Sequence, residues 1–181
     1  GVLSIVIFAK QLGYEAIIVP KGNAKEAALV PGITIYVANT LPAVFAHLTG
    51  NTSLPVQPHA LPPAEAASPI DELAAIKGHQ VIKRALAVAA AGRHNTLLYG
   101  PPGSGKTILA KAVRGLLSPL NSDEIVEITR LYSVAGLLTE AEPYITRRPF
   151  RQPHHTASVA SIVGGGRIPR PGEISLDHRG V

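Results

Sequence analysis

The residues with the clearest chemical signature form a glycine-rich run that matches the pattern Gly-x-x-x-x-Gly-Lys-Thr. The run consists of Gly100, Pro101, Pro102, Gly103, Ser104, Gly105, Lys106 and Thr107. Glycines in such a loop let backbone N–H groups surround a phosphate. Lys106 is expected to reach the β- and γ-phosphates, and the Thr107 hydroxyl is expected to bind Mg²⁺. The run therefore predicts a site for the phosphates of ATP or GTP, with Mg²⁺ held through the nucleotide.

The segments around this loop have the order that a phosphate-binding loop needs. Residues 95–99 form a compact apolar run that predicts a strand, and residues 108–117 predict a helix, so the loop connects a strand to a helix. Upstream, residues 70–92 predict a helix that Gly78 interrupts. A later helix is expected to start at Ser122, where acidic residues fit the first turn. No apolar run that ends in paired acids follows the loop, so the carboxylates that would hold Mg²⁺ and orient water are missing from this sequence.

The sequence before this region divides into an alternating unit and a proline-rich linker. Helices and strands are expected to alternate in the order helix, strand, helix, strand, helix at residues 2–11, 16–20, 23–29, 33–37 and 40–49. Five prolines then remove backbone donors from residues 51–69, so no regular element is expected there. The expected fold class is α/β, with a first unit at 1–50, a linker at 51–69 and a nucleotide-binding domain at 70–181.

The composition excludes several classes of protein. Hydrophobic residues make up 46% of the chain and charged residues 16%, which is a globular composition. No apolar run is long enough to span a membrane, and no segment resembles a secretory signal. The absence of cysteine excludes disulfides and cysteine-ligated zinc. These features predict a cytoplasmic protein. The chain lacks methionine, and its first and last residues both read as parts of a helix or strand. We therefore expect it to be an internal piece of a longer protein.

Arginines dominate the last part of the chain. Against two acids, residues 143–181 contain Arg147, Arg148, Arg151, Arg167, Arg170 and Arg179. A guanidinium pairs bidentately with phosphate or carboxylate, so these residues suit either nucleic acid or carboxylates at a subunit interface. Three glycines at 164–166 lie between Arg151 and Arg167, and with Arg170 they form a candidate DNA-facing loop. A solvated basic face is the simpler alternative.

The adjacent histidines His154 and His155 raise the question of a metal site. Adjacent residues in an extended chain point to opposite sides, so this pair is not expected to close on one ion. No third ligand follows at a suitable spacing. We therefore favour a structural or substrate-contacting role for the two histidines over a metal site.

Three further runs, read together with the loop, resemble a known family. Residues 76–107 look like an AAA+ module, in which the segment before the strand lines the adenine pocket. This resemblance implies nucleotide contacts for Ile76 and Gly78. The runs at 128–137, 147–156 and 163–176 resemble the magnesium-chelatase-like AAA+ ATPases of the ComM/YifB type. The resemblance covers nearly the whole chain.

Within that family an N-terminal domain similar to the Lon protease precedes the ATPase. The resemblance implies that residues 1–50 are the C-terminal half of this Lon-like unit, which has the fold of ribosomal protein S5 domain 2. Lon peptidases carry a Gly-Gly-Leu-Lys run that supplies a catalytic lysine, whereas this chain reads Gly1-Val2-Leu3-Ser4. A serine cannot act as the amine base of a Ser-Lys dyad. We therefore expect a structural or docking module rather than a peptidase.

The family implies a ring, expected to be a hexamer, that uses ATP and Mg²⁺ to move on branched or single-stranded DNA in transformation or recombination. It also implies that the acidic residues needed for hydrolysis follow residue 181, so this chain alone is expected to be inactive. Two other functions stay open. One is a magnesium-chelatase subunit that drives metal insertion into a porphyrin, and the other is a non-hydrolysing nucleotide-binding or peptidase-related module.

Overall fold

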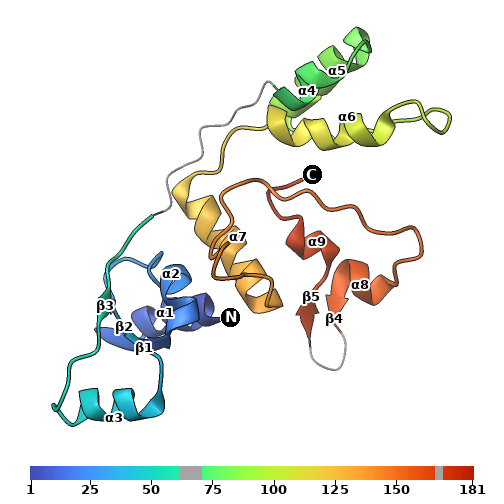
Figure 1. The fold of residues 1–181 in the computed structure, drawn as a ribbon. Coiled ribbons are helices and arrows are strands. Elements are labelled where there is room, and N and C mark those ends of the chain that lie inside the picture. Colours follow the sequence, from blue (N-terminus) through green and yellow to red (C-terminus); the bar gives the residue numbers. More distant parts are fainter. Residues whose placement is uncertain (62–70, 166–168) are drawn as a thin grey trace.

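The computed structural model describes residues 1–61, 71–165 and 169–181. Figure 1 shows three parts, namely a first unit with a small sheet, a separate group of helices α4 to α6, and a C-terminal part around α7. In the first unit, helices and strands alternate as α1 (Val2–Gln11), β1 (Ala16–Pro20), the 3-10 helix η1 (Lys21–Asn23), α2 (Ala24–Ala27), β2 (Thr34–Ala38) and α3 (Leu41–Leu48). The expected order of helix and strand is confirmed here.

The three-stranded sheet of the first unit is mixed, in the order β1-β2-β3. β1 pairs with β2 in parallel, with Ile17 opposite Ile35. A third strand, β3 (Val56–Gln57), pairs antiparallel with β2. The prediction that no regular element occurs at 51–69 is therefore wrong. The reason is that prolines flank the pair Val56 and Gln57 but do not occupy it, so both residues keep the backbone donors that a ladder needs.

The core of the first unit lies between α1 and the sheet. Leu3 and Val6 of α1 are fully buried and pack with Leu29 and Ile35. The opposite face of α1 is exposed, so the helix is amphipathic. Thr40 is the N-cap of α3, and its hydroxyl accepts a hydrogen bond from the Ala43 N–H.

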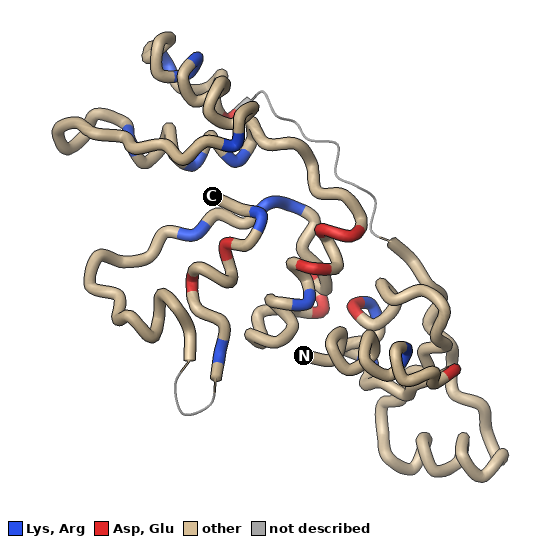
Figure 2. Tube along the Cα trace, turned by 180° about the vertical axis from the view of Figure 1, so that it is seen from behind, with Lys and Arg blue, Asp and Glu red and all other residues tan. Residues whose placement is uncertain are grey.

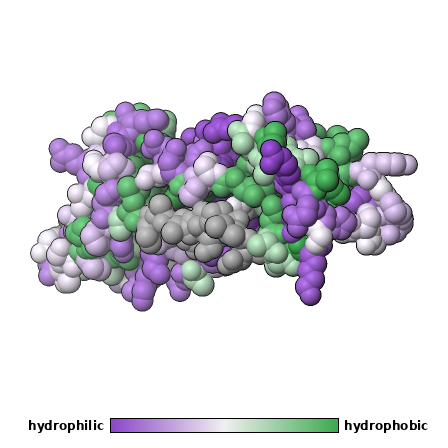
Figure 3. Space-filling view, turned by 90° about the horizontal axis from the view of Figure 1, so that it is seen from above, coloured by the Kyte–Doolittle hydropathy of each residue, from purple (hydrophilic) through white to green (hydrophobic). Residues whose placement is uncertain are grey.

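The second group of helices surrounds the glycine-rich loop. It contains α4 (Asp71–Ala75), α5 (Gln80–Gly92), α6 (Lys106–Val113) and the 3-10 helix η2 (Arg114–Leu116). Its core consists of Ile76, Leu86, Leu109 and Ala112. Gly78 separates α4 from α5 with φ of +73°, so the predicted interruption of the helix is confirmed. Figure 3 shows hydrophobic residues exposed among hydrophilic ones over this group of helices.

The predicted strand at 95–99 is absent from the described structure. The segment pairs with no other described strand, and Leu97 and Tyr99 are 91% and 98% exposed. A strand is stabilised by backbone hydrogen bonds to a neighbour and by packing on its faces. An apolar run alone supplies neither, which explains why the sequence pattern gave the wrong answer.

Helix α7 (Ser122–Ala135) contacts both the first unit and the C-terminal part. Its N-cap is Asn121 and not Ser122, and Asn121 forms a capping box with Glu124. On one side, Arg130 donates a hydrogen bond to the Ser4 hydroxyl of α1 at 3.2 Å. On the other side, the Tyr132 hydroxyl donates to the Leu176 carbonyl. Figure 2 shows acidic residues along α7.

The C-terminal part contains only short elements, as expected. They are α8 (Val159–Val163), β4 (Gly164–Gly165), β5 (Arg170–Pro171) and α9 (Glu173–Leu176). β4 and β5 pair antiparallel. Among the helices of the described residues, none is long and apolar enough to cross a bilayer.

Candidate nucleotide-binding site

The glycine-rich loop leads directly into α6. It lies at the end of α6 that projects away from the rest of the chain (Figure 1). Gly103 and Gly105 have φ of +77° and +82°, values in the left-handed region that other residues rarely adopt. Gly105 is the N-cap of α6, so the first free N–H groups of the helix point into the loop. This arrangement provides backbone donors and a positive helix end for an anion.

Lys106 folds back into this loop. Its Nζ donates hydrogen bonds to the carbonyl oxygens of Gly100 and Pro101 at 2.8 and 2.6 Å and to the Ser104 hydroxyl at 3.3 Å. The ammonium group therefore lies where a phosphate held by the loop would need a counter-charge. The donor set, an ammonium group with backbone N–H groups, fits the phosphates of a nucleotide. Thr107 follows on the first turn of α6 and is exposed.

The segment before α5 lies beside the loop. Ile76 is buried in the core of the helix group, and its carbonyl oxygen accepts a hydrogen bond from the Lys83 Nζ. A Cβ placed on Gly105 would lie 3.9 Å from the Nε2 of His79. The structure therefore places His79, which follows Gly78, beside Gly105 of the loop.

His79 itself was not among the predicted site residues. It is a non-glycine residue with φ of +55°, which is uncommon and costs backbone energy. The left-handed conformation at Gly78 and His79 turns the chain so that the imidazole faces Gly105. His79 lies within the AAA+-like stretch at 76–107, but no local pattern assigns it this contact, because its place beside Gly105 depends on how α5 packs on α6.

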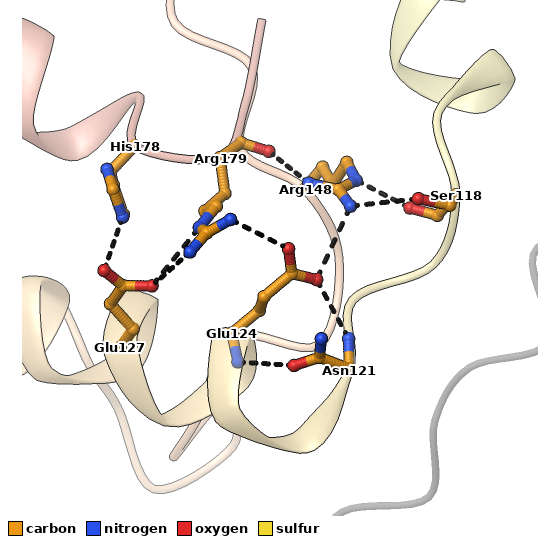
Figure 4. A network of polar contacts seen from close by, with 7 residues as sticks. All are labelled: Ser118, Asn121, Glu124, Glu127, Arg148, His178 and Arg179. Carbon is orange, nitrogen blue, oxygen red and sulfur yellow. Dashed lines mark hydrogen bonds and ion pairs between the residues drawn. The ribbon is translucent and has the colours of Figure 1, made fainter. Parts of the chain in front are cut away.

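Much of the arginine-rich segment is neutralised within the chain. Figure 4 shows Arg148 and Arg179 directed at the carboxylate of Glu124. The ion pairs measure 3.5 Å from Arg148 Nη2 and 3.2 Å from Arg179 Nη1. The Glu124 carboxylate also accepts from the Asn121 N–H, which completes the capping box. Glu124 is only 9% exposed, so the two arginines compensate a largely buried charge.

The same network joins four segments of the chain. Arg148 donates to the carbonyl oxygens of Ser118, after the loop helix, and of Arg179, near the C-terminal end. Glu127 on α7 pairs with Arg179 at 3.1 Å and with His178 at 2.8 Å. Hydrogen bonding from His178 is the main cause that lowers the pKa of the Glu127 carboxyl. Sequence reasoning missed this network because the partners lie up to 55 residues apart along the chain.

Arg151 is also paired inside the chain. Its Nε and Nη2 donate to the two carboxylate oxygens of Glu173 at 2.5 and 2.6 Å, which is the bidentate geometry. These hydrogen bonds hold the pKa of Glu173 below its ordinary value and raise the pKa of Arg151. Of the candidate DNA residues, Arg151 therefore has its guanidinium engaged, Arg170 lies exposed on β5, and Arg167 lies outside the described residues.

Replacing Glu173 with glutamine is expected to lower the free energy of unfolding by about 1 kcal/mol at neutral pH. The pKa of Glu173 is depressed in the folded state, so its stabilisation is present above the ordinary carboxyl pKa of about 4.3. It is lost as the pH falls through the lower folded pKa. Denaturant unfolding of both proteins should therefore show a difference at neutral pH that shrinks at acidic pH. An equal difference at both pH values would mean that the carboxylate charge is not the cause.

The two adjacent histidines differ from the expected arrangement. Their rings do not point to opposite sides, because the centroids of His154 and His155 lie 4.2 Å apart. A turn that begins at His155 replaces the extended backbone on which the expectation rested. The Nδ1 of His154 lies 2.7 Å from the Thr156 hydroxyl. Within the described residues, no group of three or more His, Cys, Asp or Glu gathers in a way that could hold a metal ion.

Comparison with known proteins assigns this chain to a family. The family model described as magnesium chelatase, subunit ChlI, matches residues 72–181. The chain is 45% identical over 184 residues to the uncharacterized protein Rv2897c of Mycobacterium tuberculosis (strain ATCC 25618 / H37Rv), which covers 100% of this chain and 36% of that protein. It is 43% identical over 167 residues to the uncharacterized protein YifB of Escherichia coli (strain K12), covering 91% of this chain and 32% of YifB.

A third relative carries a functional name. The competence protein ComM of Haemophilus influenzae (strain ATCC 51907 / DSM 11121 / KW20 / Rd) is 42% identical over 182 residues, covering 97% of this chain and 35% of ComM. The chain thus spans about a third of the length of these relatives. The family match begins at residue 72, after the first unit, and covers more than half of the chain. The chain therefore belongs to the magnesium chelatase ChlI family, an AAA+-type ATPase family, and is similar to YifB and ComM.

Proposed function

We propose that this chain is the nucleotide-binding part of an AAA+ ATPase that works on DNA. The observation that carries the proposal is the loop at the start of α6, where Lys106 lies within hydrogen-bonding distance of Gly100, Pro101 and Ser104. A loop of this sequence and geometry suits the phosphates of a nucleoside triphosphate. The family is of the AAA+ type, which implies the use of nucleotide and Mg²⁺.

Each residue of the site would have a separate role in binding the nucleotide. The backbone N–H groups from Gly103 to Thr107 would surround the phosphates, and Lys106 would move from the loop carbonyls to the β- and γ-phosphates. The Thr107 hydroxyl would be a ligand of Mg²⁺. Ile76 and Gly78 would border the adenine. Bound Mg-ATP supplies the phosphoanhydride bond whose hydrolysis drives the protein.

The DNA part of the proposal rests on relatives and on charge. One relative is named a competence protein, and we take this name as support for a role on DNA. In the C-terminal part Arg170 is exposed, and its side chain makes no hydrogen bond or ion pair with another described residue. We propose Arg167 and Arg170 as phosphate contacts, with Arg151 acting through its pair with Glu173. The full-length protein would be a ring, expected to be a hexamer, in the cytoplasm.

A chelatase function is the main rival, because the matching family is described by a magnesium chelatase subunit. The first unit argues against it. That unit packs on α7 through the hydrogen bond between Arg130 and Ser4, and we infer that it is a Lon-like docking module. Ser4 stands where a Lon peptidase carries its lysine, so a peptidase-related function is disfavoured as well.

The full-length protein is expected to hydrolyse ATP faster when DNA is added. Steady-state ATP turnover, measured with and without single-stranded and branched DNA, tests the proposal directly. A porphyrin substrate tested in parallel gives the matched comparison. Stimulation by porphyrin but not by DNA would support the chelatase function instead, and ATP binding without turnover would support a non-hydrolysing module.

A further inference from the structure

Phe150 lines two cavities. The first cavity has a volume of about 380 Å³ and lies against the helix that follows the glycine-rich loop. Its floor is apolar, since Ala112 is buried and Ile108 lies beside it, and its rim is charged. It is lined by Glu72, Ile108, Lys111, Ala112, Arg114 and Phe150.

The second cavity that Phe150 lines is polar. Its volume is about 520 Å³. Side chains that can donate or accept hydrogen bonds surround it, among them Gln152, His154, Thr156 and Ser161. An aromatic ring that lines both an apolar cavity with cationic residues and a cavity with hydrogen-bonding groups has the composition of a surface that binds a nucleotide unit.

The charges around Phe150 are distributed unevenly. Its neighbours in sequence, Arg148 and Arg151, are directed away to Glu124 and Glu173. Across the first cavity, Arg114 pairs with Glu72 at 3.1 Å. The side chain of Lys111 is exposed and forms no hydrogen bond or ion pair with any described residue. The rim beside Phe150 therefore retains an uncompensated positive charge that an anion can approach.

The surrounding helix group is basic as a whole. Residues 71–117 contain seven cationic side chains and two acids, a net charge of +5, while residues 118–142 contain one arginine and five acids, a net charge of −4. Figure 2 shows this contrast between the helix group and α7. A polyanion would therefore be attracted to the side of Phe150 on which α6 lies.

We propose that Phe150 is a stacking platform for one base of single-stranded nucleic acid and that Lys111 binds the adjoining phosphate. This inference rests on the proposed function in DNA metabolism and names a contact site for it. A base can stack on Phe150 only when it is not stacked in a duplex, so the site selects single strands. Stacking is tolerant of sequence because every base has a π-face, which suits a motor that moves along a strand.

The test uses the full-length protein and a short fluorescent oligothymidylate, with binding followed by anisotropy over a range of salt concentrations. Phe150→Leu keeps apolar volume but removes the aromatic face, and it is expected to weaken binding about tenfold. Phe150→Tyr is expected to bind as the wild type does. Lys111→Gln should reduce the slope of log K against log salt by about 0.7, the value for one phosphate contact on a single strand. Phe45→Leu, at an exposed site on α3, is the matched control and should have no effect.

The outcomes separate this inference from the function on which it rests. If the wild-type protein binds no nucleic acid, the proposed function in DNA metabolism is wrong. If it binds, and Phe150→Leu and Lys111→Gln bind equally well with an unchanged salt slope, only the stacking site is wrong. Two other results would also overturn the stacking site. One is that Phe150→Leu loses as much affinity for ATP as it loses for the oligonucleotide. The other is that polyglutamate displaces the labelled oligonucleotide as strongly as unlabelled oligonucleotide does. Equal thermal unfolding of the variants excludes misfolding as the cause.

Discussion

Replacing Lys106 with alanine is expected to weaken ATP binding at least about 100-fold while the chain keeps its fold. The lysine would make charge-assisted hydrogen bonds to two phosphates, and each is worth about 1.5–3 kcal/mol. Without nucleotide, Nζ bonds only to Gly100, Pro101 and Ser104 of an exposed loop. Water can replace these bonds, and alanine has the higher helix propensity at the start of α6. Titration of a fluorescent ATP analogue measures the affinity, and circular dichroism measures the fold.

Arg84→Ala provides the matched control for this experiment. Arg84 lies exposed on α5 in the same basic helix group, so its loss removes the same charge from the same part of the chain. It is expected to leave ATP affinity within about twofold of the wild type, since a single exposed charge contributes little. If the two variants lose affinity equally, the effect is one of net charge. If Lys106→Ala binds the analogue as tightly as the wild type, the loop is not the phosphate site.

Local sequence patterns predicted those elements whose stability is local. The helix at 2–11 has the predicted bounds, because helix hydrogen bonds are internal to the segment. The strand at 16–20 also has the predicted bounds, because the next strand of the alternating unit, 34–38, pairs with it. The cap at Thr40 likewise involves only residues three positions apart. The segment at 95–99 shows the converse, since an apolar run forms a strand only when a partner pairs with it.

Long-range pairing also explains why charge counting described the site incompletely. The sequence shows six arginines in residues 143–181, but it does not show that Arg148 and Arg179 pair with Glu124 or that Arg151 pairs with Glu173. These acids lie 22 to 55 residues from their partners. The glycine-rich loop was found readily because all of its chemistry lies within eight consecutive residues. His79 was not found, because its place beside Gly105 depends on how α5 packs on α6.

Replacing Glu124 with alanine is expected to destabilise the chain by about 3–5 kcal/mol, the usual cost of removing one partner of a buried ion pair. The side chains of Glu124 and Arg148 are only 11% and 10% exposed. The substitution would leave the guanidinium of Arg148 in a largely dry environment without its counter-charge, and it would also remove the capping box at the start of α7. Because Arg148 contacts Ser118 and Arg179 as well, the segments on both sides of α7 should loosen together. Denaturant unfolding of the wild type and the variant measures the difference.

Glu127→Ala is the matched control, because Glu127 is on the same helix and pairs with Arg179, but its side chain is 45% exposed. Water can solvate Arg179 when this partner is lost, so the expected cost is at most about 1 kcal/mol. A large difference between the two variants would show that burial, and not the number of ion pairs, determines the stability of the network. Equal losses in the two variants would instead mean that Glu124 is solvated in solution, and the network would then not hold the C-terminal segment against α7.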